Sequence, residues 1–416
     1  MSLKWFSGKH FPKFGALEIL KYVGPGFLVT VGFIDPGNWA ANVAAGADYG
    51  YSLLWMVTLS TLMLILLQHN AAHLGIATGL CLSEASTKHL GRWRSRVLLS
   101  SAMAAAVSTA LAEILGAAIG LNMLCGLPLG IGVVLAASAG AFMLFSNSYR
   151  KLERWIIGFV SLIGLAFLFE LSLLHLDWTR AAAGWIVPSV PQGSLPVIMS
   201  VLGAVVMPHN IFLHSEVIQS RQWNLEGDDI IRRQLKYEFL DTLFAMIVGW
   251  AINSAMILVA ASVFHANNVV VTELPQAEAT LRPLLGNAAA TVFAVALLLA
   301  GFASSITAAM AGGSIFAGIF MEPFDLKDSH SRAGVVITLT GALLAVFLLS
   351  DPFRGIIWSQ IILSIQLPWT ILGLITLTSS RTVMGKFANT LSEKLMLWAT
   401  AIFVTILNVM LLVQFL

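Results

Sequence analysis

The first long apolar segment of the chain, from about Val23 to about Ala47, is interrupted at its centre by Asp35-Pro36-Gly37-Asn38. An aspartate at mid-bilayer costs about 2.5 to 3.5 kcal/mol even on lenient insertion scales. Proline removes a backbone donor and glycine loosens the chain, so a continuous helix is unfavourable here. Because irregular backbone at membrane depth persists only where protein buries it or where it lines a cavity, we predict a transmembrane helix broken at its middle. The alternative, an ordinary surface turn, is disfavoured by the apolar runs on both sides.

Composition agrees with a membrane location. Only 11% of the 416 residues are charged and 58% are hydrophobic, whereas soluble domains carry about 25% charged residues. About 20 apolar residues cross a bilayer as a helix, and on that measure the sequence predicts an all-α integral membrane protein with eleven spans. The predicted spans are 23–47, 52–77, 97–124, 129–146, 155–175, 195–218, 238–263, 289–318, 333–350, 355–378 and 395–416.

The distribution of basic residues predicts the orientation. Of the 23 Lys and Arg residues, all but Arg180, Arg282 and Arg354 fall in the N-terminal segment or in loops that follow even-numbered spans. The positive-inside rule then places the N-terminus in the cytoplasm and the C-terminus outside it, in a multi-pass protein of the cell (inner) membrane. Because these residues are spread among short loops, no nucleic-acid partner is expected.

A second interruption, Met207-Pro208-His209-Asn210, lies in the sixth span. Aligning Pro36 on Pro208 also aligns Asn38 on Asn210. Two broken helices five spans apart predict five-plus-five inverted repeats with a site at their interface, near mid-membrane. The whole chain, 1–416, is then a single transmembrane transporter domain with repeat one at about 23–175, repeat two at about 195–378 and an extra helix at about 395–416.

The two interruptions offer ligands for a cation. Asp35 supplies an anionic oxygen, Asn38 a neutral oxygen, Gly32 and Ala204 main-chain carbonyls before each break, and Met207 a thioether. Oxygen ligands alone suit calcium or magnesium, whereas the added sulfur favours manganese, iron or cobalt. Most methionines only pack in a core, but the position of Met207 beside a helix-breaking proline favours a ligand role.

Four ionisable residues are candidates for proton uptake and release: Asp35, His209, His214 and Glu113. An imidazole titrates near ambient pH, and an ionisable group deep in a membrane segment, such as Glu113, is a functional candidate by default. The alternatives are a satisfied interior imidazole for each histidine and a protonated packing residue for Glu113.

The two interruptions resemble the signatures of the natural resistance-associated macrophage protein (NRAMP) family of divalent metal transporters, bacterial manganese-transport type. Asp35-Pro36-Gly37-Asn38 is similar to its first-helix signature and Met207-Pro208-His209 to its sixth-helix signature, followed by His214-Ser215. The likeness extends over essentially all eleven spans. It implies a fold similar to the amino-acid symporter (LeuT) architecture, with broken helices 1 and 6, and proton-linked uptake of manganese or iron by alternating access.

The resemblance also implies a metal-ligand set. It contains Asp35, Asn38, Met207 and the carbonyls of Ala204 and Gly32. Gln360 is similar to a tenth-helix glutamine that joins the site in closed states, and Asn253 to a polar position of the seventh helix.

Several positions depart from the family pattern in ways that bear on proton coupling. Ala110 stands where helix three usually carries an aspartate, Met103 where another acid is frequent, and Arg332 alone where helix nine has paired arginines. Loss of an acid and a base together is electrostatically consistent, because removing one partner strands a buried charge. His69 and His73 stand where asparagines are common, and they are either structural or part of a replacement proton path.

We therefore predict a secondary transporter, not an enzyme, that imports Mn2+ with Fe2+ as a lesser substrate and couples this to protons. Its partners are the metal ion, protons and the lipid bilayer; no cofactor and no obligatory protein partner are expected. The alternatives are a proton-uncoupled carrier with the same site, a Mg2+ carrier and a sodium-driven amino-acid symporter. A symporter of that kind needs an anion-binding helix end for the carboxylate, which Asp35 opposes. The sequence contains no ATP-binding loop of the Gly-x-x-x-x-Gly-Lys type, which argues against a pump powered within the chain.

Overall fold

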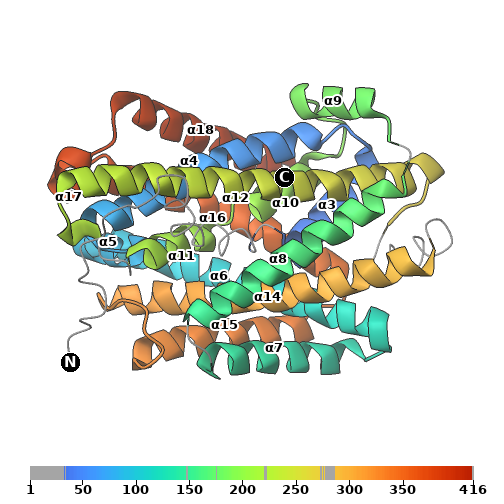
Figure 1. The fold of residues 1–416 in the computed structure, drawn as a ribbon, viewed down its shortest axis with the longest axis horizontal. Helices are drawn as coiled ribbons and strands as arrows, with labels where there is room; N and C mark the ends of the chain where they lie inside the picture. Colours follow the sequence, from blue (N-terminus) through green and yellow to red (C-terminus); the bar gives the residue numbers. More distant parts are fainter. Residues whose placement is uncertain are drawn as a thin grey trace, which may run out of the picture.

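Helices make up nearly all of the computed structural model, which describes residues 32, 34–146, 149–174, 176–219, 223–271, 274, 276 and 286–414 (Figure 1). No β-strand occurs among these residues. The α-helices are α3 (Pro36–Tyr49), α4 (Leu54–Thr78), α5 (Leu82–His89), α6 (Arg92–Cys125), α7 (Leu129–Ser146), α8 (Tyr149–Ser172), α9 (Trp178–Ile186), α10 (Leu195–Val205), α11 (Pro208–Gln219), α12 (Asp228–Val263), α14 (Asn287–Ile319), α15 (Ser329–Phe347), α16 (Pro352–Thr378), α17 (Arg381–Met384) and α18 (Leu391–Gln414). Short 3-10 turns lie at Trp223–Leu225 (η3), His265–Asn267 (η4) and Gly385–Phe387 (η5).

The described residues contain 10 helices long and apolar enough to cross a membrane, when α10 and α11 are taken as one interrupted span. They correspond to the second to eleventh predicted spans, which are thereby confirmed to within a few residues, except at helix starts such as α12, which begins ten residues early. For the first span, α3 is the half that follows the predicted break. The half before it, 23–31, lies outside the described residues, as do the basic N-terminal segment, Arg221 and Arg282.

The break in the sixth span is confirmed. Helix α10 ends at Val205 and α11 begins at Pro208, so Val206 and Met207 lie between two helices rather than inside one. Proline at the first position of α11 is favourable because its missing N–H has no partner in a first helical turn. The same reasoning applies to Pro36, which begins α3.

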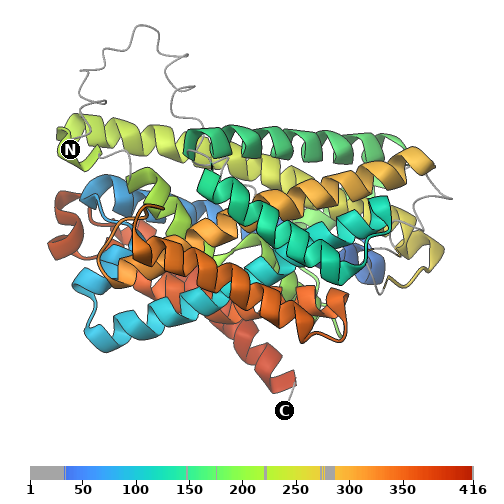
Figure 2. The same cartoon turned by 90° about the horizontal axis from the view of Figure 1, so that it is seen from below.

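The interior of the bundle is formed by α3, α6, α10, α11 and α14, whose residues are mostly buried. Helix α6 packs along α14, and α10 packs against both α3 and α16. Helices α7, α8 and α15 lie on the outside of this core (Figure 2). They expose large apolar side chains, such as Phe142 and Leu168. Large exposed apolar faces are expected where lipid, not water, is the surrounding medium.

The two ends of the bundle differ. Helices α5, α11 and α17 lie toward one end, and α9 lies toward the other (Figure 1). At the first end, Lys386 forms an ion pair with Asp228 at the start of α12, and the Arg232 guanidinium lies 5.8 Å from the Phe387 ring centroid. Loops that follow the sixth and tenth spans therefore meet at one end, as the alternation of basic loops requires.

Candidate functional site

Asp35 caps the helix that begins at the first break. Its Oδ1 accepts hydrogen bonds from the backbone N–H of Asn38 (2.6 Å) and from the Asn38 side-chain Nδ2 (2.8 Å). An aspartate at this position satisfies N–H groups that have no partner within the first helical turn. Trp39 Nε1 donates to the carbonyl of Ile34 at 3.1 Å, which ties α3 to the chain before the break.

Asn38 connects the first break to the second. Its Nδ2 also donates to the Ala204 carbonyl at 2.8 Å, on the last turn of α10. Met207, three residues further on, is buried against Ala105 and Leu363, and its sulfur accepts from Asn210 Nδ2 at 3.6 Å. The two interruptions predicted from the sequence are thus adjacent in space.

Gln360 of α16 lies against both broken helices. A Cβ atom at Gly37 would collide with the Gln360 side chain, and one at Gly203 would collide with the Gln360 carbonyl. Glycine at these two positions lets α3 and α10 approach α16 more closely than any other residue allows. Gly32 similarly lies directly against the Asn210 side chain.

Four buried side-chain oxygens around the breaks have no hydrogen-bond partner among the described residues. They are Asp35 Oδ2, Asn38 Oδ1, Asn210 Oδ1 and Gln360 Oε1. Leaving such a group unsatisfied costs about 1–3 kcal/mol, more when it is charged. Gln360 on α16 contacts Gly37 of α3, and Gly32 before α3 contacts Asn210 of α11. A bound cation would satisfy unpaired oxygens of this kind, one of which is a carboxylate.

The structure brings all six predicted ligands to the two breaks, with one difference. The Ala204 carbonyl was expected to be unpaired, but it accepts a hydrogen bond from Asn38, so a metal ligand there would have to replace this bond. Asn210 was assigned no role from the sequence although its oxygen is among the unpaired atoms. Its alignment with Asn38 across the two interruptions was the signal that could have identified it.

Glu113 lies on α6 beside the first break. Its carboxyl group accepts from Thr109 Oγ1 at 3.0 Å and from the Ser304 hydroxyl, and it lies close enough to Asp35 for the two carboxyl groups to interact. Helices α3 and α6 are in close contact at this point, because Pro36 packs directly on Gly116 one turn further along. The two carboxyl groups therefore lie near each other between α3 and α6.

Four buried or partly buried histidines lie on two neighbouring helices, His209 and His214 on α11 and His69 and His73 on α4. His209 is buried at the start of α11, and its Nδ1 has no partner among the described residues. His214 Nδ1 lies 2.9 Å from Gln68 Oε1 on α4. On the next residue of α4, His69 Nδ1 lies 2.6 Å from Glu238 Oε2, and its ring stacks toward His73 at 6.1 Å. Polar side chains thus extend from the second break across α4 to α12.

The positions that depart from the family pattern are apolar or lie at the surface. Ala110 and Met103 are buried in apolar contacts on α6. Arg332 is exposed, and its Nε donates to the Leu326 carbonyl at 2.6 Å instead of to a buried acid. Asn253 accepts from Asn42 Nδ2 at 2.5 Å, so this predicted polar position links α12 to α3.

A sixth span that is interrupted where it meets the start of α3 at buried polar residues is typical of secondary transporters with a LeuT-like fold. The structure matches that of the Eremococcus coleocola manganese transporter with a TM-score of 0.80, at 27% identity, over 99% of this chain and 90% of that one. At the level of fold alone it also matches Mhp1, a nucleobase-cation-symport-1 family transporter, with a TM-score of 0.62 and 16% identity over 93% of this chain and 91% of that one.

The sequence makes the assignment specific. Residues 26–414 match the family model described as natural resistance-associated macrophage protein-like. The chain is 37% identical over 399 residues to the divalent metal cation transporter MntH of Caldanaerobacter subterraneus subsp. tengcongensis, covering 95% of this chain and 93% of the relative. It is 36% identical over 409 residues to MntH of a Nostoc species, covering 95% and 91%. The protein belongs to the NRAMP family of membrane transporters.

Proposed function

We propose that this protein imports divalent transition-metal ions, Mn2+ first and Fe2+ as a lesser substrate, by proton-linked alternating access. The four unpaired buried oxygens at the two breaks carry this proposal, because a bound cation would pair with oxygens for which the described residues supply no hydrogen-bond donor. The relatives named as divalent metal cation and manganese transporters support the choice of metal.

The residues of the two breaks have distinct roles in this proposal. Asp35 neutralises the charge of the ion, Asn38 and the carbonyls of Gly32 and Ala204 replace its water ligands, and Met207 disfavours magnesium and calcium because thioether sulfur is a soft ligand. Gln360 adds an oxygen from α16 when both broken helices close against it. Its contacts with Gly37 and Gly203 support this role.

Proton movement would use Asp35, Glu113, His209 and His214. Glu113 is buried beside Asp35 on α6 and is held by two hydroxyl groups. The ion and a proton would then compete for the Asp35 carboxylate, and Glu113 would accept the proton that the metal displaces.

Alternating access would move the two broken helices against the rest of the bundle, with repeats at about 23–175 and 195–378 and an extra helix at about 395–416. The protein would lie in the cell (inner) membrane with the N-terminus in the cytoplasm and the C-terminus outside it. The meeting of basic loops at the end that contains α5 and α17 supports this orientation.

Transport assays on the full-length protein in liposomes test the proposal. Inward Mn2+ flux and internal acidification should both occur with the wild-type protein and both stop in Asp35→Asn, which keeps the size of the side chain but removes its charge. Mn2+ flux that persists undiminished in Asp35→Asn would refute the assigned site. Uptake of an amino acid that Mn2+ does not inhibit would support the symporter alternative instead.

An uncoupled carrier is the second candidate. The family pattern places an acidic and a basic residue within the membrane. In this chain the acidic position is Ala110, in apolar contacts, and Arg332 lies at the surface, so this buried pair is missing. Mn2+ uptake without acidification in the same liposomes would establish this version. Efficient Mg2+ uptake by the wild type would instead favour the magnesium carrier and contradict the proposed role of Met207.

A further inference from the structure

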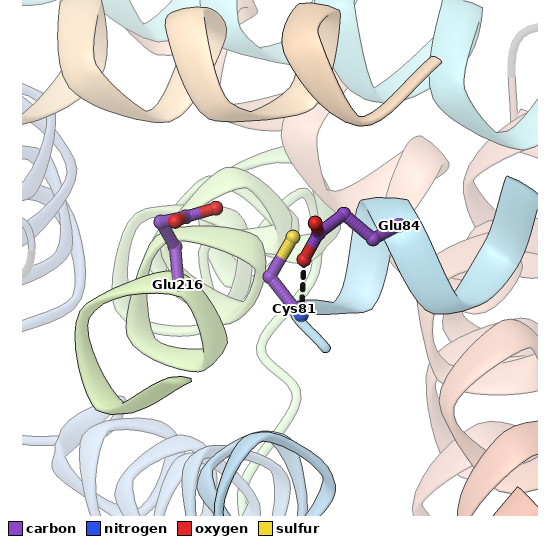
Figure 3. A group of neighbouring side chains, drawn as sticks. All are labelled: Cys81, Glu84 and Glu216. Carbon is purple, nitrogen blue, oxygen red and sulfur yellow. Dashed lines mark hydrogen bonds between the residues drawn. The ribbon is translucent and has the colours of Figure 1, made fainter. Parts of the chain in front are cut away.

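A second group of potential metal ligands lies apart from the two breaks. Cys81 directly precedes α5, Glu84 lies in the first turn of α5, and Glu216 lies near the end of α11 (Figure 3). One ligand atom from each residue falls within 4.8 Å of those of the other two. All three side chains are buried, with at most 5% of the residue exposed.

Hydrogen bonds hold the two carboxylates in place from outside the cluster. Glu216 Oε2 accepts from Ser314 Oγ at 2.9 Å and its Oε1 from the Phe324 N–H at 3.2 Å. Ser215 Oγ accepts from the Leu82 N–H at 2.8 Å, which fixes α11 against the start of α5. The approach of Glu216 to Cys81 is therefore fixed by hydrogen bonds from Ser314 and the Phe324 backbone, and by the bond between Ser215 and the start of α5.

Glu84 leaves one oxygen directed into the cluster. Its Oε2 accepts from the Cys81 N–H at 2.9 Å and from Gln219 Nε2 at 3.3 Å, whereas no described donor bonds to its Oε1. Figure 3 shows the Glu84 carboxylate turned back over the Cys81 sulfur, with the Glu216 carboxylate pointing toward the same sulfur. A side chain more than nine-tenths buried thus presents an unpartnered oxygen to the thiol.

No lysine or arginine of the described residues forms an ion pair with either glutamate. Two carboxylates whose oxygens lie within 4.8 Å of each other, away from bulk water, repel each other strongly when both are charged. All their described hydrogen-bond donors are neutral. A divalent cation bound by both carboxylates would offset this repulsion.

We infer that Cys81, Glu84 and Glu216 form a second binding site for a divalent transition-metal ion. One thiolate and two carboxylates suit Fe2+, Co2+, Zn2+ or Cd2+ better than magnesium or calcium, which take oxygen ligands. Three protein ligands leave a coordination position for water, which is the arrangement of exchangeable rather than permanently closed sites.

The position of this site relates it to the first. Glu216 lies on α11, eight residues after Pro208 at the second break, which corresponds to about 12 Å at the rise of an α-helix. Its partners Cys81 and Glu84 lie at the start of α5, so the cluster lies toward the end of the bundle where α5 and α17 are found (Figure 1). With the orientation proposed above, this is the cytoplasmic side, where an ion released from the two breaks would next be bound.

Co2+ binding to the full-length protein in lipid nanodiscs tests the inference, because thiolate coordination of Co2+ produces a strong near-ultraviolet charge-transfer absorption and thioether coordination does not. In an Asp35→Ala background, which removes the first site, the absorption should remain and titrate with one Co2+ per protein. Cys81→Ser should abolish it, and Glu84→Gln and Glu216→Gln should each weaken Co2+ binding at least about tenfold. Cys125→Ser is the matched control and should change nothing.

The inference is overturned if the Asp35→Ala protein shows no such absorption, if Cys81→Ser retains it, or if Cys125→Ser abolishes it. Folding is verified independently, because Cys81→Ser and Glu216→Gln with Asp35 intact should still bind Mn2+ at the two breaks. If the cluster does not bind metal, the Co2+ absorption is absent while Asp35-dependent Mn2+ binding is unchanged. If the proposed function is wrong instead, Asp35-dependent Mn2+ binding is absent while the Co2+ absorption remains.

Discussion

Asn38 Nδ2 donates to the Ala204 carbonyl at 2.8 Å, and this single hydrogen bond joins α3 to α10 across 166 positions of sequence. The same side chain donates to Asp35 Oδ1 and leaves its own Oδ1 unpaired. One carboxamide therefore fixes the distance between the breaks and offers a ligand oxygen to the space between them.

Replacing Asn38 by alanine removes both functions. We expect Mn2+ affinity, measured by calorimetry, to fall by about 10- to 100-fold, which corresponds to about 1.4 to 2.7 kcal/mol. Asn42→Ala is the matched control, because Asn42 is also buried on α3 but bonds to Asn253 and Met256. Equal losses of affinity in both variants would show that Asn38 acts only through stability.

Met207 is expected to determine selectivity through its sulfur. In Met207→Ala, we expect Mg2+ and Ca2+ to compete with Mn2+ for uptake and Mn2+ affinity to fall by about tenfold, since oxygen ligands alone do not discriminate against hard cations. Met207→Leu separates chemistry from packing, because it retains an apolar side chain of similar volume. A leucine variant as selective as the wild type would contradict the role of the sulfur.

Glu113→Gln is expected to separate metal binding from proton movement. The amide keeps the shape of the side chain and can still bond to Thr109 and Ser304, but it cannot release a proton. Mn2+ should still bind to within about threefold of wild type, while a pH-sensitive dye inside liposomes should report little metal-driven acidification. The control is Glu170→Gln, a buried carboxyl on α8. Unchanged acidification in Glu113→Gln would exclude this residue from the proton path.

Gly203→Ala should destabilise the protein, because the added Cβ would collide with the Gln360 carbonyl on α16. Overpacking of this kind costs about 1–3 kcal/mol, and we expect a lower midpoint of thermal unfolding together with weaker Mn2+ binding. Gly158→Ala is also within a helix, but no atom lies within 4 Å of the new Cβ. This variant should instead raise the midpoint slightly, because alanine stabilises a helix by about 0.5–1 kcal/mol relative to glycine. The reverse order of the two midpoints would contradict the close approach of α10 and α16.

The two cysteines should react at very different rates with N-ethylmaleimide. Burial raises the pKa of the Cys81 thiol, and the nearby Glu216 and Glu84 raise it further, whereas Cys125 is exposed. Since the thiolate is the nucleophile, Cys81 should react at least about tenfold more slowly at pH 7 and faster as the pH rises toward its pKa. Mass spectrometry of Cys125→Ser and Cys81→Ser proteins measures each rate, and equal rates would refute the enclosed position of Cys81.

The spans and the break at Pro208 could be read from local patterns. Hydropathy over about 20 residues is a property of one segment against its surroundings, and a proline among polar residues opposes a helix wherever the rest of the chain lies. For these reasons ten of the spans and the interruption between Val205 and Pro208 were predicted without any knowledge of their neighbours.

Which side chains meet across the bundle depended on packing. The pairing of Asn38 with the Ala204 carbonyl, the contact of Gln360 with Gly37 and Gly203, and the meeting of Glu216 with Cys81 all depend on how each helix is rotated about its own axis. That rotation follows from the fit of one helix surface against several others at once. The sequence pattern of a single segment does not specify this rotation, so the Cys81 cluster could be identified only from the folded chain.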